Sequence, residues 1–241
     1  MAIFGRKKTS EQSPGHAAVL RTLNEKDKTD PNARLQLAGA VVFDMVCRII
    51  QNERGTRIDD VLAILGATGG FSCIVSTMSV LTEANVTIQE AGLAVVKGAD
   101  NQIYYFGDVP NKALLESKFS LLSLTLGAAH SLGAQVSLDL VHDTLKHVAS
   151  TVGGAQFGIP ILPEGHQPGD LPINYVKHLW PKIREALDTY EVPATRYHMA
   201  LGFAIYKAIE AGKDAIDPLL AARIVTECAV PMAKLDPARF Q

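Results

Sequence analysis

The sequence predicts a mainly α-helical fold, with about seven helices packed as one globular domain and a single β-hairpin near 92–107. Three observations favour this fold class. Apolar residues recur at helical spacing through most of the chain, one segment alone holds two apolar runs around a short polar turn, and strands and helices do not alternate. With 241 residues, of which 47% are hydrophobic, the chain can bury a core without disulfide bonds.

The chain is expected to begin with a flexible polar N-terminal tail over residues 1–29, followed by a single helical domain over residues 30–241. One short helix is expected inside the tail, near Ala17 to Leu23. Folding starts at Asp30-Pro31, because an Asp that caps and a Pro in the first turn begin a helix. Apolar residues then recur at helical spacing up to about Asn52.

A second helix is expected from Asp59-Asp60, whose carboxylates favour a helix N-terminus. Inside it the stretch VLAILGATGGFSCIV raises the alternative of a strand, a phosphate-binding glycine loop and a helix. The three turn positions hold Gly66, Gly69 and Ser72, so the last is not glycine, and no Lys follows for a P-loop. We therefore expect that these small residues let two helices approach closely, and that they hold no phosphate.

Residues 61–82 carry no charge and are long enough to cross a bilayer. They contain many Ser, Thr and Gly residues and lack a clear aromatic belt or a one-sided cationic flank, so a buried central helix is preferred and membrane insertion is not expected. The net charge of −2 provides no broad field toward nucleic acid, and we expect no nucleic-acid partner.

The hairpin is expected to have strands near 92–97 and 102–107, with Gly98, Asp100 and Asn101 in its turn. A lone two-stranded ribbon is marginal in water, so it must lie on a helix or pair with another strand. The rest is predicted to be helical over Pro110 to about Leu132, Leu138 to Ser150 after a Ser137 cap, Pro172 to about Tyr190 with Pro181 as a kink or break, Ala194 to Ala211, and Pro218 through Thr226 with a bend or end before Pro231.

Residues 151–171 hold five glycines and three prolines without helical periodicity. Their aromatic and aliphatic residues predict an ordered loop, and such loops are usually functional. Together with the following helix they form the candidate site for a small molecule or a protein segment in the 151–180 region: Glu164, His166, Asp170, Asn174, Tyr175 and His178. In the alternative interpretation Tyr175 packs in the core and its hydroxyl bonds a loop carbonyl.

A strip of carboxylates and imidazoles is the second candidate: Asp139, His142, Asp143 and His147 lie at helical spacing. Such a strip can hold a divalent metal that activates water. The His142-Asp143 pair also resembles the doublet of HD-type phosphohydrolases, and that resemblance implies a further His and Asp, for which His130 and one of Asp170, Asp188 or Asp217 are the candidates. The competing interpretation is an exposed polar face opposite a buried apolar stripe.

The three cysteines, Cys47, Cys73 and Cys228, lie in apolar surroundings without close pairing or zinc spacing, so buried free thiols in the cytoplasm are expected. No motif set identifies a family. We therefore expect a cytoplasmic helical protein that acts by binding an unidentified ligand or partner, as a homo-oligomer, without a cofactor. The aromatic hairpin with an unpaired edge is the predicted contact. The alternative is a metal-dependent hydrolase that uses the 139–147 strip.

Overall fold

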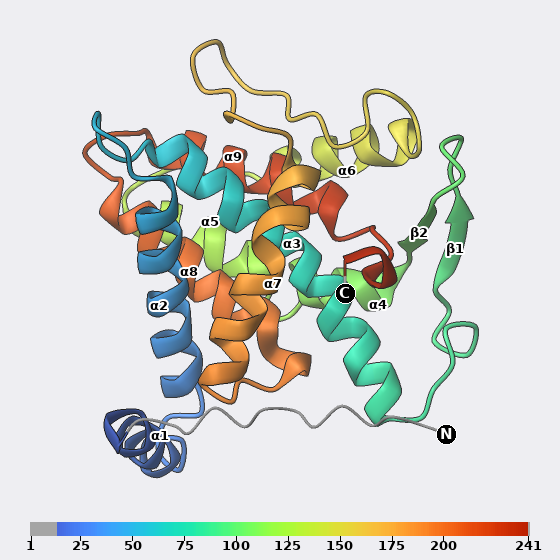
Figure 1. Cartoon of the computed structure of the whole chain (residues 1–241). Coiled ribbons are helices and arrows are strands. Elements are labelled where there is room, and N and C mark those ends of the chain that lie inside the picture. The colour runs from blue at the N-terminus through green and yellow to red at the C-terminus, as the bar shows by residue number, and fades with distance from the viewer. Residues whose placement is uncertain (1–13, 241) are drawn as a thin grey trace, which may run out of the picture. The chain divides into compact units, whose positions relative to one another are not determined.

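The computed structural model describes residues 14–240. They are mainly α-helical, with eight helices of more than ten residues and a two-stranded antiparallel hairpin (Figure 1), so the predicted fold class is confirmed. The described chain divides into two units, residues 14–34 and 35–240. Helix α1 (Pro14–Lys26) covers the short helix expected inside the predicted tail. Residues 1–13 of that tail lie outside the described residues.

Seven further long helices, two strands and four short helical turns follow α1 in the described chain. They are α2 (Ala33–Ile50), α3 (Ile58–Glu83), β1 (Ala94–Lys97), β2 (Ile103–Phe106), the single turn α4 (Asp108–Asn111), the π-helical turn η1 (Lys112–Glu116), α5 (Leu121–Ser131), α6 (Asp139–Thr151), α7 (Pro172–Thr189), the 3₁₀ turn η2 (Ala194–Arg196), α8 (Tyr197–Ala211), α9 (Pro218–Met232) and the 3₁₀ turn η3 (Pro237–Phe240).

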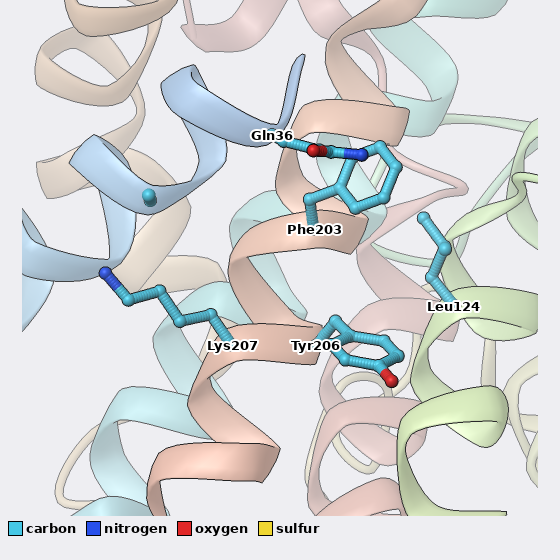
Figure 2. A pocket seen from close by; sticks show the side chains of 6 residues that line it. Gln36, Leu124, Phe203, Tyr206 and Lys207 are labelled. Carbon is cyan, nitrogen blue, oxygen red and sulfur yellow. The ribbon is translucent and has the colours of Figure 1, made fainter. Parts of the chain in front are cut away.

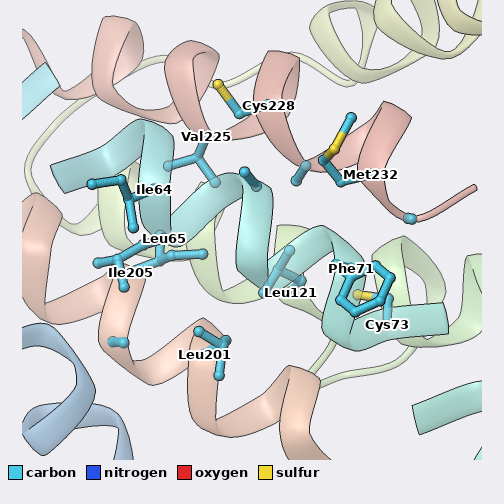
Figure 3. Packing of buried hydrophobic residues seen from close by; sticks show 14 of the residues in the cluster. Ile64, Leu65, Phe71, Cys73, Leu121, Leu201, Ile205, Val225, Cys228 and Met232 are labelled. Carbon is cyan, nitrogen blue, oxygen red and sulfur yellow. The ribbon is translucent and has the colours of Figure 1, made fainter. Parts of the chain in front are cut away.

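Helix α3 is the centre of the second unit, where it passes between α8 and α9 (Figures 1 and 3). Residues 61–74 are buried on every side, as expected for a helix that neighbours cover all round. Among the described helices, α3 is the one that is long and apolar enough to span a membrane, and 89% of its most apolar window is buried inside the fold. The preferred interpretation of this segment as a buried central helix agrees with that packing.

The glycines of α3 lie where α9 comes closest. A Cβ atom added at Gly70 would lie 2.6 Å from Cα of Ala229, and one added at Gly66 would lie 3.0 Å from Cα of Val225. Real Cβ atoms do not approach backbone so closely, so these positions accept only glycine. Because α3 runs without interruption through this stretch, the predicted close contact of two helices is confirmed and no glycine turn forms for a phosphate.

The hairpin is also confirmed, with Val95 opposite Tyr105 and Val96 opposite Tyr104. It does not stand alone. The Tyr105 N–H donates to the carbonyl of Lys234 at 2.8 Å, so the outer side of β2 is held by the segment that follows α9.

The hairpin tip is fixed as well. A Cβ atom added at Gly98 would lie 2.8 Å from Cα of Gly153, so the hairpin turn packs directly on the turn after α6. The rings of Tyr104 and Phe157 meet edge to face at 4.9 Å. The expectation that the ribbon must pack on other elements is therefore confirmed.

One predicted helix is wrong in its extent. The range Pro110–Leu132 is divided into α4, η1 and α5, because the chain is extended at Ser117, with ψ 152°. Serine side chains replace the helical hydrogen bonds there. Ser120 Oγ accepts from the N–H of Ser123 at 3.2 Å, and the Ser123 hydroxyl lies 3.2 Å from the carbonyl oxygen of Leu115.

Two prolines interrupt their helices less than expected. Helix α7 continues through Pro181, and α9 continues through Pro231 to Met232. A break at Pro181 and an end before Pro231 are therefore wrong. The predicted start of α9 is correct, since Asp217 Oδ1 accepts a hydrogen bond from the N–H of Leu220 at 2.9 Å.

Candidate functional site

The second half of the loop 151–171 is attached to the first turn of α3. The Nδ1 atom of His166 lies 2.7 Å from Oδ1 of Asp59, and the N–H of Gly169 donates to Oδ1 of Asp60 at 2.8 Å. The guanidinium of Arg57 lies 3.6 Å from the carboxylate of Asp59 and 3.7 Å from that of Asp60. Charged groups thus fix this part of the loop.

A second polar cluster forms where α7 begins. Asn174 donates to Oδ1 of Asp170 at 2.7 Å, and the N–H of Asp170 donates to the Tyr175 hydroxyl oxygen at 2.9 Å. The bond from Asn174, and then the bond from the N–H of Leu171, lower the pKa of Asp170. Burial raises the pKa of Tyr175 to about 12. The hydroxyl of Tyr175 therefore bonds loop backbone, although it bonds an amide and not the carbonyl that the alternative interpretation expected.

Glu164 and His178 are exposed, and within residues 14–240 neither side chain forms a hydrogen bond or an ion pair. The structure thus joins Asp170, Asn174 and Tyr175 to one another and places His166 against Asp59. The partner Asp59 is a functional candidate that the sequence did not single out, because it lies 107 positions from His166. Whether these six residues bind a ligand stays a prediction.

The first half of the loop is attached through Glu227 of α9, which is 6% exposed. Its carboxylate accepts from the N–H of Ile161 at 3.1 Å and from the Thr144 hydroxyl of α6 at 3.1 Å. The residues Ile159 and Ile161 are nevertheless 39% and 49% exposed. The loop is therefore an ordered surface that presents two isoleucines to solvent.

The four residues of the predicted metal strip lie along one solvent-facing side of α6. Asp139, His142 and Asp143 are exposed and His147 is partly exposed on α6. Asp139 bonds the Ser137 hydroxyl at 2.7 Å, and Asp143 lies 3.9 Å from the ammonium of Lys146. Among the described residues no group of three or more His, Cys, Asp or Glu side chains is placed to hold a metal ion. The strip has the geometry of a solvated helix face.

The expected free thiols are present in the described chain. Cys73 and Cys228 are buried, and Cys47 is partly buried. Burial raises the pKa of the Cys73 and Cys228 thiols well above the usual range, so both are protonated and unreactive.

A cavity of about 320 Å³ lies between α2, α5 and α8. Figure 2 shows Phe203 and Tyr206 of α8 beside Leu124 of α5, while Lys207 extends toward α2. The ammonium of Lys207 lies 3.0 Å from Asp44. Apart from Gln36 and the Tyr206 hydroxyl its wall is apolar, and its lysine is paired, so this cavity mainly offers contact area.

The β1 edge of the hairpin is a further candidate for contact with another molecule. Val95 of β1 is 50% exposed, and Ala94 and Lys97 are exposed too. The other edge of the hairpin is already paired with Lys234. A sheet edge with unpaired backbone groups is a site where another strand can add.

Comparison with known proteins yields no family, no curated protein and no solved structure that matches the chain.

Proposed function

We propose that this chain is a cytoplasmic binding protein that works as a homo-oligomer, and that a second copy pairs with the outer edge of β1. The observation that supports this most strongly is the difference between the two edges of the hairpin. The β2 edge is paired within the chain, while the β1 edge is exposed. The free thiols agree with a reducing compartment.

The hydrogen-bond pattern between β1 and β2 indicates which backbone groups of β1 are free to bond another strand. The N–H of Tyr105 points away from β1, toward Lys234. In an antiparallel pair, residues bonded to the partner strand alternate with residues whose N–H and C=O point outward. Val95, which faces Tyr105, therefore directs its backbone groups outward, and so does Lys97. Within residues 14–240 these outward groups have no hydrogen-bond partner.

A second copy complements this edge by symmetry. A twofold axis at Val96 pairs Val95 of one copy with Lys97 of the partner subunit, and the same patch is used on both sides. The register that would place two Lys97 ammonium groups opposite each other is disfavoured by like charge. Pairing extends two two-stranded hairpins into one four-stranded sheet, which is a more stable unit than two strands.

The segment 151–180 is the proposed surface for a small molecule or a protein segment. Its support is the ordered backbone that holds Ile159, Ile161, Glu164 and His178 toward solvent. The contact residues proposed on it are Glu164, His166, Asp170, Asn174, Tyr175 and His178.

The substitution Val95→Pro tests the β1 edge. Proline removes the outward N–H but leaves the ladder bonds of Ala94 and Val96 to β2 in place. Two four-residue strands bury less than the roughly 1,200 Å² of a stable complex, so we expect weak association that increases with concentration. Sedimentation equilibrium should show a monomer–dimer equilibrium for the native chain and a monomer for Val95→Pro.

The matched control is Val95→Thr, which keeps the N–H and a β-branched side chain and should associate like the native chain. Circular dichroism should be the same for all three proteins. A native chain that stays monomeric at every concentration, or a Val95→Pro chain that associates as strongly as the native one, would contradict the proposal.

A further inference from the structure

A second cavity, of about 210 Å³, lies between the C-terminal half of α3, the π-helical turn η1 and the start of α8. Hydroxyl, aliphatic, cationic and imidazole side chains form its wall: Ser76, Thr77, Val80, Val109, Lys112, Ala113, Ser117, Thr195 and His198. The wall contains no carboxylate. Single π-helical turns occur frequently at functional sites, and here one of them supplies both Lys112 and Ala113.

His198 is held in this wall without using its full bonding capacity. The residue is 9% exposed, and its Nδ1 atom has no hydrogen-bond partner within residues 14–240. Its backbone N–H lies 3.4 Å from the hydroxyl oxygen of Ser76, which itself donates to the carbonyl of Ala194 at 2.9 Å. The Nδ1 atom is itself closed off from solvent, so Nε2 is the ring nitrogen that a ligand in the cavity can reach. A hydrogen bond from a ligand to that side of the ring is favourable because the imidazole has no other partner in the described chain.

The wall also offers free donors. The hydroxyls of Ser76 and Thr77 already donate hydrogen bonds to backbone carbonyls. In the described part of the chain, the ammonium of Lys112 and the hydroxyls of Ser117 and Thr195 form no hydrogen bond or ion pair. The cavity thus combines one cation and two free hydroxyls with the aliphatic surface of its valines and alanine.

The protonation state of His198 suits such a cavity. Burial, and then the positive charge of Arg196, lower the pKa of His198 to about 4. The ring is therefore neutral at pH 7 and carries one N–H donor. At pH 7 His198 therefore adds no second positive charge beside Lys112.

We propose that this cavity binds a short-chain carboxylate, whose anionic group accepts hydrogen bonds from Lys112, Ser117, Thr195 and the imidazole of His198. The aliphatic chain packs on Val80, Val109 and Ala113. The wall holds a lysine and no carboxylate, so its charge favours an anionic ligand over a cationic one. The volume is below the roughly 300–1,000 Å³ of sites for drug-sized ligands, so the chain of the ligand is short. This site is independent of self-association at β1.

The test uses n-butyrate and the uncharged n-butyramide as probes at pH 7. Titration is followed by the side-chain ¹⁵N resonances of His198, which locate the binding event at this cavity. We expect a saturable shift with butyrate and binding about tenfold weaker with butyramide, because the charge-assisted hydrogen bond to Lys112 is lost.

Lys112→Gln should weaken butyrate binding about tenfold and abolish the preference over butyramide. Lys118→Gln, at another exposed lysine outside the cavity wall, is the matched control and should bind butyrate like the native chain. Val80→Phe, at a residue 46% exposed, should narrow the cavity and reduce the affinity for both probes. The proposal is overturned if butyrate leaves the His198 resonances unchanged, or if Lys112→Gln binds butyrate as tightly as Lys118→Gln does.

Discussion

At Gly70 the absence of a Cβ atom allows α3 to lie directly against the backbone of α9. An added methyl group would meet the Ala229 backbone, which cannot move without shifting the whole of α9. Gly127 of α5 is the opposite case, because it is exposed in the middle of a helix and an added Cβ there meets nothing within 4 Å. The same residue type therefore serves packing at one position and has no packing role at the other.

We expect Gly70→Ala to lower the free energy of unfolding by about 3 kcal/mol or more, as overpacking against rigid backbone does. Gly127→Ala should raise it by about 0.5–1 kcal/mol, because alanine loses less backbone entropy in a helix. Urea denaturation of both variants measures the difference. Equal stability of the two variants would show that the contact between α3 and α9 is not as close as described.

His198 predicts how stability depends on pH. Burial lowers its pKa from 6.5 to about 4, so between these values the unfolded chain binds a proton that the folded chain does not. The free energy of unfolding should therefore fall by about 3 kcal/mol as the pH decreases from 6.5 to 4, and this contribution should be fully present above pH 6.5. In denaturation at a series of pH values, His198→Asn should lack this component, while His130→Asn, at an exposed histidine, should retain it.

At the scale of elements, the sequence was sufficient to predict a helix or strand wherever neighbouring residues specify it. Asp217-Pro218 marks the start of α9, and the apolar runs around Asn101 mark the hairpin. The break at Ser117 was missed because the leucines around it keep helical spacing. The available signal was Ser120, a helix-capping residue directly before the apolar start of α5.

The candidate site was predicted less completely, for a physical reason. Periodicity and capping are local, whereas His166 meets Asp59 and Ile161 meets Glu227 across the fold. The composition of residues 151–171 was enough to predict an ordered loop. It was not enough to identify the helices that hold the loop, nor the cavity beside His198.

Glu227 of α9 connects that helix to α6 and to the loop 151–171, and its removal should release the loop. In Glu227→Ala the N–H of Ile161 loses its acceptor, whereas the Thr144 hydroxyl keeps the carbonyl oxygen of Leu140 at 3.0 Å. Loss of a hydrogen bond to a charged acceptor typically costs about 1.5–3 kcal/mol. We expect the Ile161 amide to exchange with deuterium about tenfold faster or more, because the loop opens without global unfolding.

Glu227→Gln is the matched variant, since it keeps an oxygen acceptor with nearly the same shape. Its Ile161 amide should exchange more slowly than that of Glu227→Ala. If alanine leaves the exchange of Ile161 unchanged, the loop is held by other contacts, such as the bonds of His166 and Gly169 to α3.

At the scale of the whole molecule, the second unit is organised around a helix whose apolar character resembles a membrane span. Its burial by α7, α8 and α9 accounts for that composition within the fold. The β1 edge is different, because its hydrogen-bonding groups are not all paired. The outward backbone groups of Val95 and Lys97 lack partners in residues 14–240. Our central claim is that a second copy of the chain supplies those partners.

Hydrogen exchange at single amides of β1, measured as a function of protein concentration, tests this claim most directly. The outward amides of Val95 and Lys97 should become slower to exchange as the concentration rises, whereas the amide of Val96, already bonded to β2, should change little. If Val95 and Lys97 exchange at the same rate at every concentration, the edge does not pair with a second copy and the claim is wrong.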